Sequence, residues 1–141
     1  MSNVVATYGK SFNITALFIT HDKEDAFFLS NRIAIMHGGE ILQVGSPKEL
    51  YNKPKNLYCA NFLGKINELF KNQFIRPEKI YLSTNSKYKA KINNITFYGS
   101  FYEINATFNN QEILINSLDC RLNIGDEIYF DYNKDDLIQI F

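Results

Sequence analysis

A histidine between two polar residues follows directly on a short apolar run, and it is the first candidate for chemistry in this chain of 141 residues. Residues 16–19 are apolar, and Thr20, His21 and Asp22 come next. In α/β proteins, ligand-binding groups lie just past the carboxyl end of a strand. An imidazole placed there can donate a hydrogen bond to a ligand without carrying a fixed full charge. The alternative interpretation is a histidine in a loop that has no functional role.

Acidic residues crowd the same position, which raises the question of a metal site. Asp22, Glu24 and Asp25 fall at the start of an expected helix. Acids there cap the first turn and interact favourably with the positive end of the helix dipole. No other Asp, Glu or His stands at a spacing typical of metal ligands. We therefore predict no metal site.

Composition excludes several classes of protein. Lys and Arg total 15, as do Asp and Glu, so the formal charge is zero and does not favour nucleic-acid or membrane-surface binding. No apolar run approaches the roughly 18 residues that span a bilayer. The first residues lack the apolar segment of a signal peptide, so we expect a cytoplasmic protein. Cys59 and Cys120 are too few and too far apart to suggest a metal pair, and we expect reduced thiols.

The first half of the chain has a mixed α/β pattern. Ser46, Pro47 and Glu49 form the best local signal, because a Ser cap, a Pro at the first helical position and a Glu three residues after the cap make a capping box. Gly64 is a plausible end of the last helix and a domain boundary. In order, we predict a strand, a helix, a hairpin and two short helices, over residues 16–20, 22–31, 32–45, 47–52 and 56–64.

After Gly64 the pattern becomes almost entirely β. Turn signals occur at residues 109–110, 125–126 and 133–136. Short strands over about 75 residues are typical of a small barrel of the OB kind. We predict strands over residues 66–70, 74–75, 79–82, 88–93, 101–108, 112–116, 127–132 and 137–141.

Several motifs in this order resemble the C-terminal part of ATP-binding subunits of ABC importers, in the group that imports polyamines, ferric iron, sulfate and sugars. They are Thr-His-Asp at 20–22, GEILQVGSPKELYNKP at 39–54, ANFLG at 60–64 and RPEKI at 76–80. The resemblance covers residues 12–141. It implies an α+β chain, with a partial α/β remnant of a P-loop ATPase domain over residues 1–64. A small all-β, OB-like TOBE barrel with a regulatory role follows over residues 65–141.

The resemblance also implies roles for individual residues. His21 matches the switch histidine, which donates to the γ-phosphate of ATP and positions the attacking water. Arg76, Pro77 and Glu78 match a motif that opens the regulatory domain and packs against an ATPase domain of the same or the second subunit. The alternative for these three residues is an Arg–Glu surface pair around a rigid proline, which contributes little energy. The cofactors of the intact parent protein are ATP and Mg²⁺.

The departures from the family pattern are large. The chain has no Gly-x-x-x-x-Gly-Lys-Ser/Thr loop, no Leu-Ser-Gly-Gly-Gln signature and no apolar strand that ends in Asp-Glu. Residues 9–11 are Gly-Lys-Ser, but Val4 stands where the phosphate loop needs its first glycine. We interpret residues 8–12 as the end of a helix that precedes the histidine strand. The chain alone is expected neither to bind ATP tightly nor to hydrolyse it.

Expected partners follow from the resemblance. They are a second copy of the chain and the membrane permease subunits of the intact transporter, at the cytoplasmic face of the inner membrane. We also expect self-association through residues 12–45, because the helix and strand there would normally pack against more of a sheet.

Two other functions stay open. The chain could be a non-catalytic module that senses a small oxyanion or another solute, or one that dimerises. An OB-type nucleic-acid binder would use the aromatic residues at 97–102, but Lys87, Lys89 and Lys91 form the only basic cluster. We therefore predict no nucleic-acid partner.

Overall fold

The computed structural model describes the backbone of residues 2–8 and all of residues 15–141. It is mostly β, with 47% of residues in strands and 20% in helices. The chain divides into two compact units, residues 1–64 with 140–141 (unit 1) and residues 65–139 (unit 2). None of the helices in the described ranges has the length and apolar character needed to cross a bilayer.

Unit 1 is built on a four-stranded sheet with the order β2-β1-β3-β4, in which all neighbours are antiparallel. Its strands are β1 (Ser2–Tyr8), β2 (Ala16–Thr20), β3 (Arg32–His37) and β4 (Glu40–Gly45). Because β1 pairs with both β2 and β3, the latter two run in the same direction. Helix α1 (Lys23–Leu29) makes the crossover between them that parallel strands require.

Strand β1 corrects one expectation and leaves another without confirmation. Tyr8 was expected at the end of a helix, but it closes a strand whose residues include the β-branched Val4, Val5 and Thr7. The rest of that expected helix end, residues 9–12, lies outside the described residues. The antiparallel pairing of β1 means that an α/β remnant of a P-loop domain is not confirmed.

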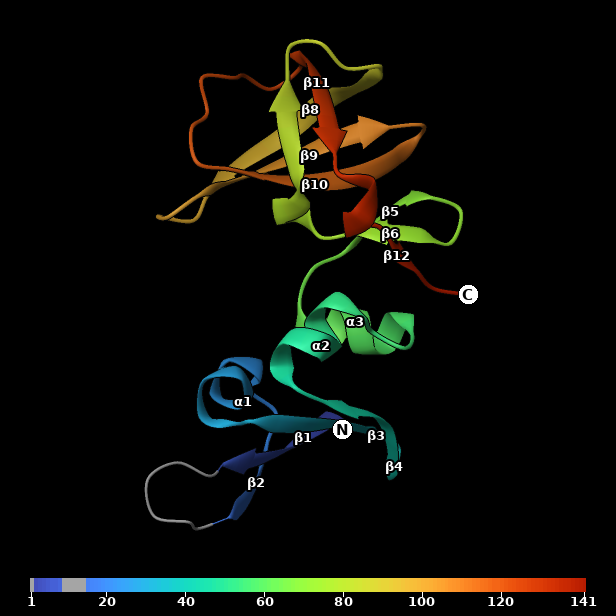
Figure 1. Cartoon of the computed structure of the whole chain (residues 1–141). Coiled ribbons are helices and arrows are strands. Elements are labelled where there is room, and N and C mark those ends of the chain that lie inside the picture. The colour runs from blue at the N-terminus through green and yellow to red at the C-terminus, as the bar shows by residue number, and fades with distance from the viewer. Residues whose placement is uncertain (1, 9–14) are drawn as a thin grey trace. The chain divides into compact units, whose positions relative to one another are not determined.

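Three helices cover one face of this sheet (Figure 1). They are α1, α2 (Pro47–Asn52) and α3 (Leu57–Leu63). The predicted capping box starts α2, since Ser46 Oγ accepts from the N–H of Glu49 and Glu49 Oε2 accepts from the N–H of Ser46 at 2.9 Å. Gly64 ends α3 in extended backbone (φ 167°), not in the left-handed conformation of a glycine cap. The buried core consists of Ala26, Ile33, Ile35, Leu50, Cys59 and Leu63.

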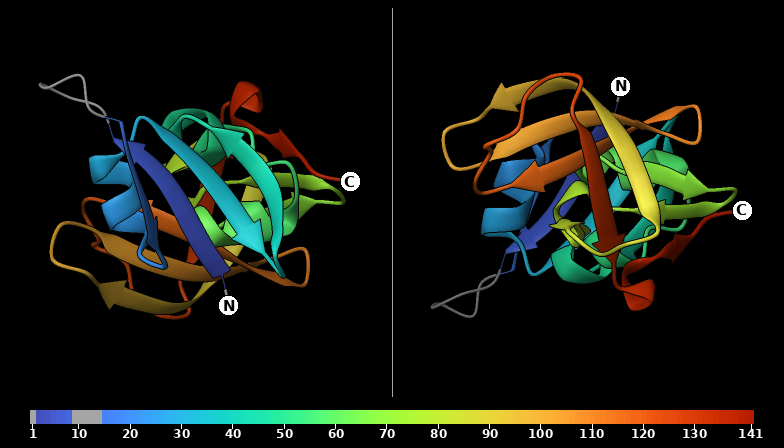
Figure 2. Two further views of the ribbon diagram at one scale, coloured as in Figure 1. Left: turned by 90° about the horizontal axis from the view of Figure 1, so that it is seen from below. Right: turned by 90° about the horizontal axis from the view of Figure 1, so that it is seen from above.

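Unit 2 contains a five-stranded antiparallel sheet with the order β10-β9-β8-β11-β7, and a three-stranded sheet with the order β12-β6-β5. The larger sheet is curled, which is compatible with a small OB-like barrel (Figure 2). The strands are β5 (Asn67–Phe70), β6 (Gln73–Ile75), β7 (Ile80–Ser83), β8 (Tyr88–Phe97), β9 (Tyr102–Phe108), β10 (Gln111–Ser117), β11 (Glu127–Tyr132) and β12 (Ile138–Gln139).

The core of unit 2 lies inside the curl. Its aromatic centre is Phe130, which is fully buried, stacks on Tyr88 at 5.6 Å between ring centroids and meets Phe108 edge to face at 5.0 Å. Offset and edge-to-face pairs of this kind add stabilisation beyond the area that they bury. Aliphatic side chains surround these rings, among them Leu69, Ile75, Ile80, Ile92, Ile104, Ile113 and Ile115.

Local geometry explains where the predicted boundaries failed. Strand β8 continues to Phe97, four residues past its predicted end, and its register against β9 shifts between Ile92 and Asn94. Such a bulge re-phases the alternation, and Ile95 packs against the core although it stands three residues after Ile92. Residues 133–136 were predicted as a hairpin turn, but residues 134–136 form a 3-10 turn, η2 (Lys134–Asp136), between β11 and β12.

Candidate functional site

His21 lies immediately after β2, and its side chain is exposed. The backbone on its C-terminal side is held by short polar side chains. Thr20 Oγ1 accepts from the N–H of Asp22 at 3.0 Å, and Asp22 Oδ1 accepts from the N–H of Glu24 at 2.8 Å. The sequence-predicted cap of α1 is therefore confirmed, and it fixes the backbone beside the imidazole.

The residues around His21 do not by themselves fit MgATP. A phosphate cradle needs successive backbone N–H groups that point at the anion, or a lysine that reaches it. Here the N–H groups of Asp22 and Glu24 already donate to side chains of the same loop. Within residues 15–141, no three His, Cys, Asp or Glu side chains are grouped to hold a metal ion.

Arg76, by contrast, is a buried residue at the start of unit 2. Its side chain is only 2% exposed, and Nη1 donates to the carbonyl oxygen of Lys65 at 3.0 Å. Pro77 is buried too, and Glu78 is exposed in the short turn η1 (Pro77–Lys79). Because Arg76 is inside the fold, the interpretation of an exposed Arg–Glu pair does not describe it. A buried guanidinium needs hydrogen-bond acceptors, and the Lys65 carbonyl is one.

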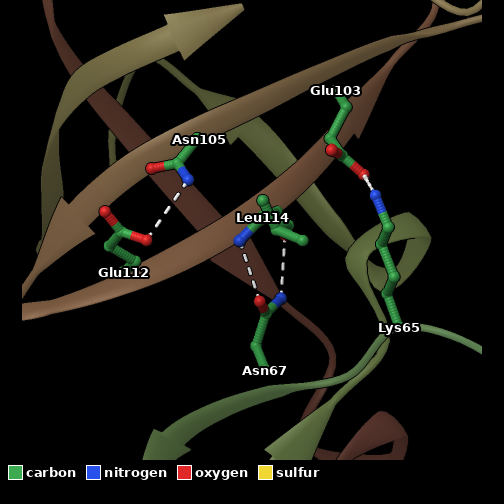
Figure 3. Close-up of polar contacts among 6 residues, drawn as sticks. All are labelled: Lys65, Asn67, Glu103, Asn105, Glu112 and Leu114. Carbon is green, nitrogen blue, oxygen red and sulfur yellow. Dashed lines mark hydrogen bonds and ion pairs between the residues drawn. The ribbon is translucent and has the colours of Figure 1, made fainter. Parts of the chain in front are cut away.

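Side chains of the first residues of unit 2 form hydrogen bonds with residues of β9 and β10 (Figure 3). Lys65 Nζ lies 2.6 Å from Glu103 Oε2 and 5.4 Å from the centre of the Tyr98 ring. The hydrogen bond to Glu103 raises the pKa of the Lys65 ammonium, which therefore stays charged at neutral pH. Asn67 exchanges two hydrogen bonds of 2.8 Å with the backbone of Leu114.

Four aromatic rings mark the turn between β8 and β9. Phe97 lies 5.0 Å from Tyr102, and Tyr98 stacks on Phe101 at 5.2 Å. Gly99 has a positive φ of 85°, a conformation that glycine adopts without strain. The rings therefore pack on one another across the turn, as expected for packing at the rim of a small barrel.

Two of the cavities in unit 2 are lined mostly by residues that the sequence did not single out, with Glu78 and Phe101 as the exceptions. One cavity has a volume of about 420 Å³, and the other about 400 Å³. The first is lined by Glu78, Ser100, Phe101, Asn116, Ser117 and Leu118. The second is lined by Leu82, Ser83, Thr84, Leu122, Glu127, Ile128 and Tyr129. Neither set forms a motif in the sequence, because folding brings it together from separate segments.

Relatives of the chain are transport proteins, although no family model matches it. It is 30% identical, over 94% of its length, to the Fe(3+) ions import ATP-binding protein FbpC of Photobacterium profundum. It is 30% identical, over 93% of its length, to the spermidine/putrescine import ATP-binding protein PotA of Bacillus thuringiensis. PotA of Mycoplasma genitalium is 38% identical over 67% of the chain. The chain is a homologue of the C-terminal part of ABC importer ATP-binding subunits.

This finding confirms the resemblance that the motifs carried. The chain spans about half the length of the curated relatives that match nearly all of it, 47% of the Photobacterium subunit and 44% of the Bacillus subunit. Only 17% of the Mycoplasma subunit is matched. More than half of each ABC importer subunit thus has no counterpart among these 141 residues.

Proposed function

We propose that the chain forms the C-terminal, regulatory portion of the ATP-binding subunit of an ABC importer, which couples ATP hydrolysis to solute uptake. The observation that carries this proposal is the similarity over 93–94% of the chain to subunits of that name. Residues 1–64 would be the C-terminal remnant of the ATPase domain. Residues 65–141 would be the TOBE-like barrel, and the curled sheet of unit 2 supports this assignment.

His21 would contact nucleotide only where the rest of an ATPase domain is supplied. Its position after β2 and its exposed side chain support this role. ATP and Mg²⁺ would then be held by residues outside this chain, because the loop around His21 has no phosphate cradle. The chain alone would be inactive.

Arg76, Pro77 and Glu78 would form a regulatory or interface segment at the start of the barrel. The bond from Arg76 to the Lys65 carbonyl supports this, because it fixes the segment to the first residue of unit 2. The partners would be a second copy of the subunit and the membrane permease. The assembly would lie at the cytoplasmic face of the inner membrane.

A chimaera tests the proposal. The part of the Photobacterium FbpC subunit that precedes the match is fused to this chain, and thermal unfolding is measured with and without MgATP. We expect MgATP to raise the unfolding temperature of the chimaera and not that of the 141-residue chain. A folded chimaera that is indifferent to MgATP would contradict the proposal.

A second candidate function is a non-catalytic module for small-ligand sensing or dimerisation. The cavities in unit 2 favour the sensing role, because their volumes fall within the range of small-molecule sites. This candidate predicts that molybdate, sulfate, phosphate or another small solute raises the unfolding temperature of the chain while MgATP does not. No stabilisation by any of these solutes would remove the support for a sensor.

A further inference from the structure

We infer that the cavity beside the β8–β9 turn binds a small, neutral aromatic carboxamide, and that Asn116 recognises the amide group. The cavity has a volume of about 420 Å³ and is lined by Glu78, Ser100, Phe101, Asn116, Ser117 and Leu118. All of these residues belong to unit 2. The inference therefore goes beyond the proposed role in transport and does not depend on it.

The side-chain amide of Asn116 provides the recognition, because its oxygen is a buried acceptor without a partner. Asn116 Oδ1 is shielded from solvent and accepts no hydrogen bond from the described residues, which is an unfavourable state for a polar atom. The same side chain ends in an NH₂ group with two donors, and its terminal torsion has broad preferences. Rotation about this torsion can turn the amide toward the cavity. A primary carboxamide offers an N–H and a C=O side by side, so it can exchange two hydrogen bonds with Asn116.

An aromatic ring selects the body of the ligand. Phe101 lines the cavity, and it stacks on Tyr98 with ring centroids 5.2 Å apart and an angle of 14° between the planes. A ring held in place by a neighbour can stack on a ligand's ring or meet it edge to face, and such pairs add stabilisation beyond the area that they bury. Leu118 is 86% exposed and lines the same cavity, so a ligand there would also cover aliphatic surface.

The lining does not favour a charged ligand. No basic residue lines the cavity, so an anion would meet no opposite charge there. Glu78 is its one acidic residue, and Glu78 already takes part in an interaction within the fold. A carboxamide is uncharged at neutral pH, and it still supplies the N–H donor that Asn116 Oδ1 lacks.

An NMR titration of the full chain tests the inference, with benzamide as the probe. Methyl benzoate has the same ring and a carbonyl but no N–H, sodium benzoate is the anion, and benzylammonium chloride is the cation. KCl holds the ionic strength constant. We expect saturable shifts of the Asn116 side-chain amide and the Phe101 backbone amide, with benzamide bound about tenfold more tightly than methyl benzoate, the size of a neutral hydrogen bond. A comparison solute that binds as tightly as benzamide, or benzamide without a saturable shift, would overturn the inference.

A matched pair of variants assigns the effect to Asn116. Asn116→Leu removes the amide from the cavity, whereas Asn93→Leu removes an exposed amide that does not line it. We expect Asn116→Leu to lose the preference for benzamide over methyl benzoate, and Asn93→Leu to keep it. If Asn116→Leu has a cooperative thermal transition and keeps the preference, Asn116 does not recognise the amide. The solute series on the unaltered chain decides the inference even if this variant does not fold.

Discussion

The side-chain amide of Asn67 makes the two hydrogen bonds to the backbone of Leu114 that a neighbouring strand would otherwise make. The two residues are 47 positions apart in the sequence. Asn67 Nδ2 donates to the Leu114 carbonyl at 2.8 Å, and Asn67 Oδ1 accepts from the Leu114 N–H at 2.8 Å. Leu114 belongs to β10, the edge strand of the five-stranded sheet, where unpaired backbone groups would otherwise remain. Asn67 itself is only 4% exposed, so both bonds are made inside the fold.

Replacing Asn67 by leucine should destabilise the protein by about 1–3 kcal/mol, because it leaves the N–H and C=O of Leu114 without these partners. Urea unfolding at pH 7 measures this change. Asn93→Leu is the matched control, since exposed Asn93 donates only to the side chains of Asn105 and Thr107. A loss no larger for Asn67 than for Asn93 would show that the bridge to β10 contributes little.

The capping box of α2 predicts a pH dependence. Backbone and side-chain hydrogen bonds from Ser46 lower the pKa of Glu49 below its ordinary value of 4.5. A carboxyl with a lowered pKa adds stability above its unfolded pKa, and that stability is lost as pH falls through the folded pKa. Wild type should therefore be more stable than Glu49→Gln at pH 7, and this advantage should shrink as the pH falls from 4.5 through the lower folded pKa. Thermal unfolding of both proteins across this range measures the effect, and a gap that persists unchanged at acid pH would contradict it.

Tyr132 should titrate above the ordinary range of a phenol. Burial, followed by its hydrogen bond with Tyr88 at 3.2 Å, raises the pKa of Tyr132 to about 12. A phenol with a raised pKa adds stability that is complete below its ordinary value of 10 and is lost as pH rises toward 12. Ultraviolet titration should show a phenolate that forms near pH 12 in wild type and is lost in Tyr132→Phe. If the variant keeps the late transition, the assignment to Tyr132 is wrong.

The sheet face of unit 1 that the helices do not cover should drive self-association. Leu17 and Ile19 of β2 are 69% and 65% exposed, and Val44 of β4 is 46% exposed. Ile19 and Val44 fall in one row across the sheet, through the register positions of Val5 and Ala34. Exposed apolar faces of this kind promote association.

The double variant Leu17→Lys/Ile19→Lys should reduce the mass observed by sedimentation equilibrium. The double replacement puts two charges on this face. Leu118→Lys, at a position 86% exposed in unit 2, is the control and should not change the mass. A wild-type chain that stays monomeric at high concentration would refute self-association through residues 12–45.

Features coded by neighbouring residues could be predicted from the sequence. Ser46, Pro47 and Glu49 start α2 as expected, and Asp22 starts α1, because a cap depends on side chains within three residues of the backbone that they bind. The hairpin of β9 and β10 turns at Asn109 and Asn110, both at positive φ, as their residue types predicted.

Features that depend on distant partners could not be predicted in this way. Strand β1 pairs with β2 and β3, which both follow it in the chain. The types of residues 2–8 do not indicate these two partner strands. Ile95 reaches the core only because the bulge after Ile92 breaks the alternation. The bond from Asn67 to Leu114 and the cavity around Asn116 join segments whose spacing in the sequence carries no periodic signal.

ATP hydrolysis by the chimaera tests the central claim most directly, with His21→Ala beside the unaltered chain and His37→Ala as the control from the β3–β4 hairpin. The account predicts that the chimaera hydrolyses ATP, that His21→Ala removes this activity, and that His37→Ala retains it. A chimaera that binds MgATP and hydrolyses it equally well with alanine at position 21 would contradict the assignment of His21 as the switch histidine.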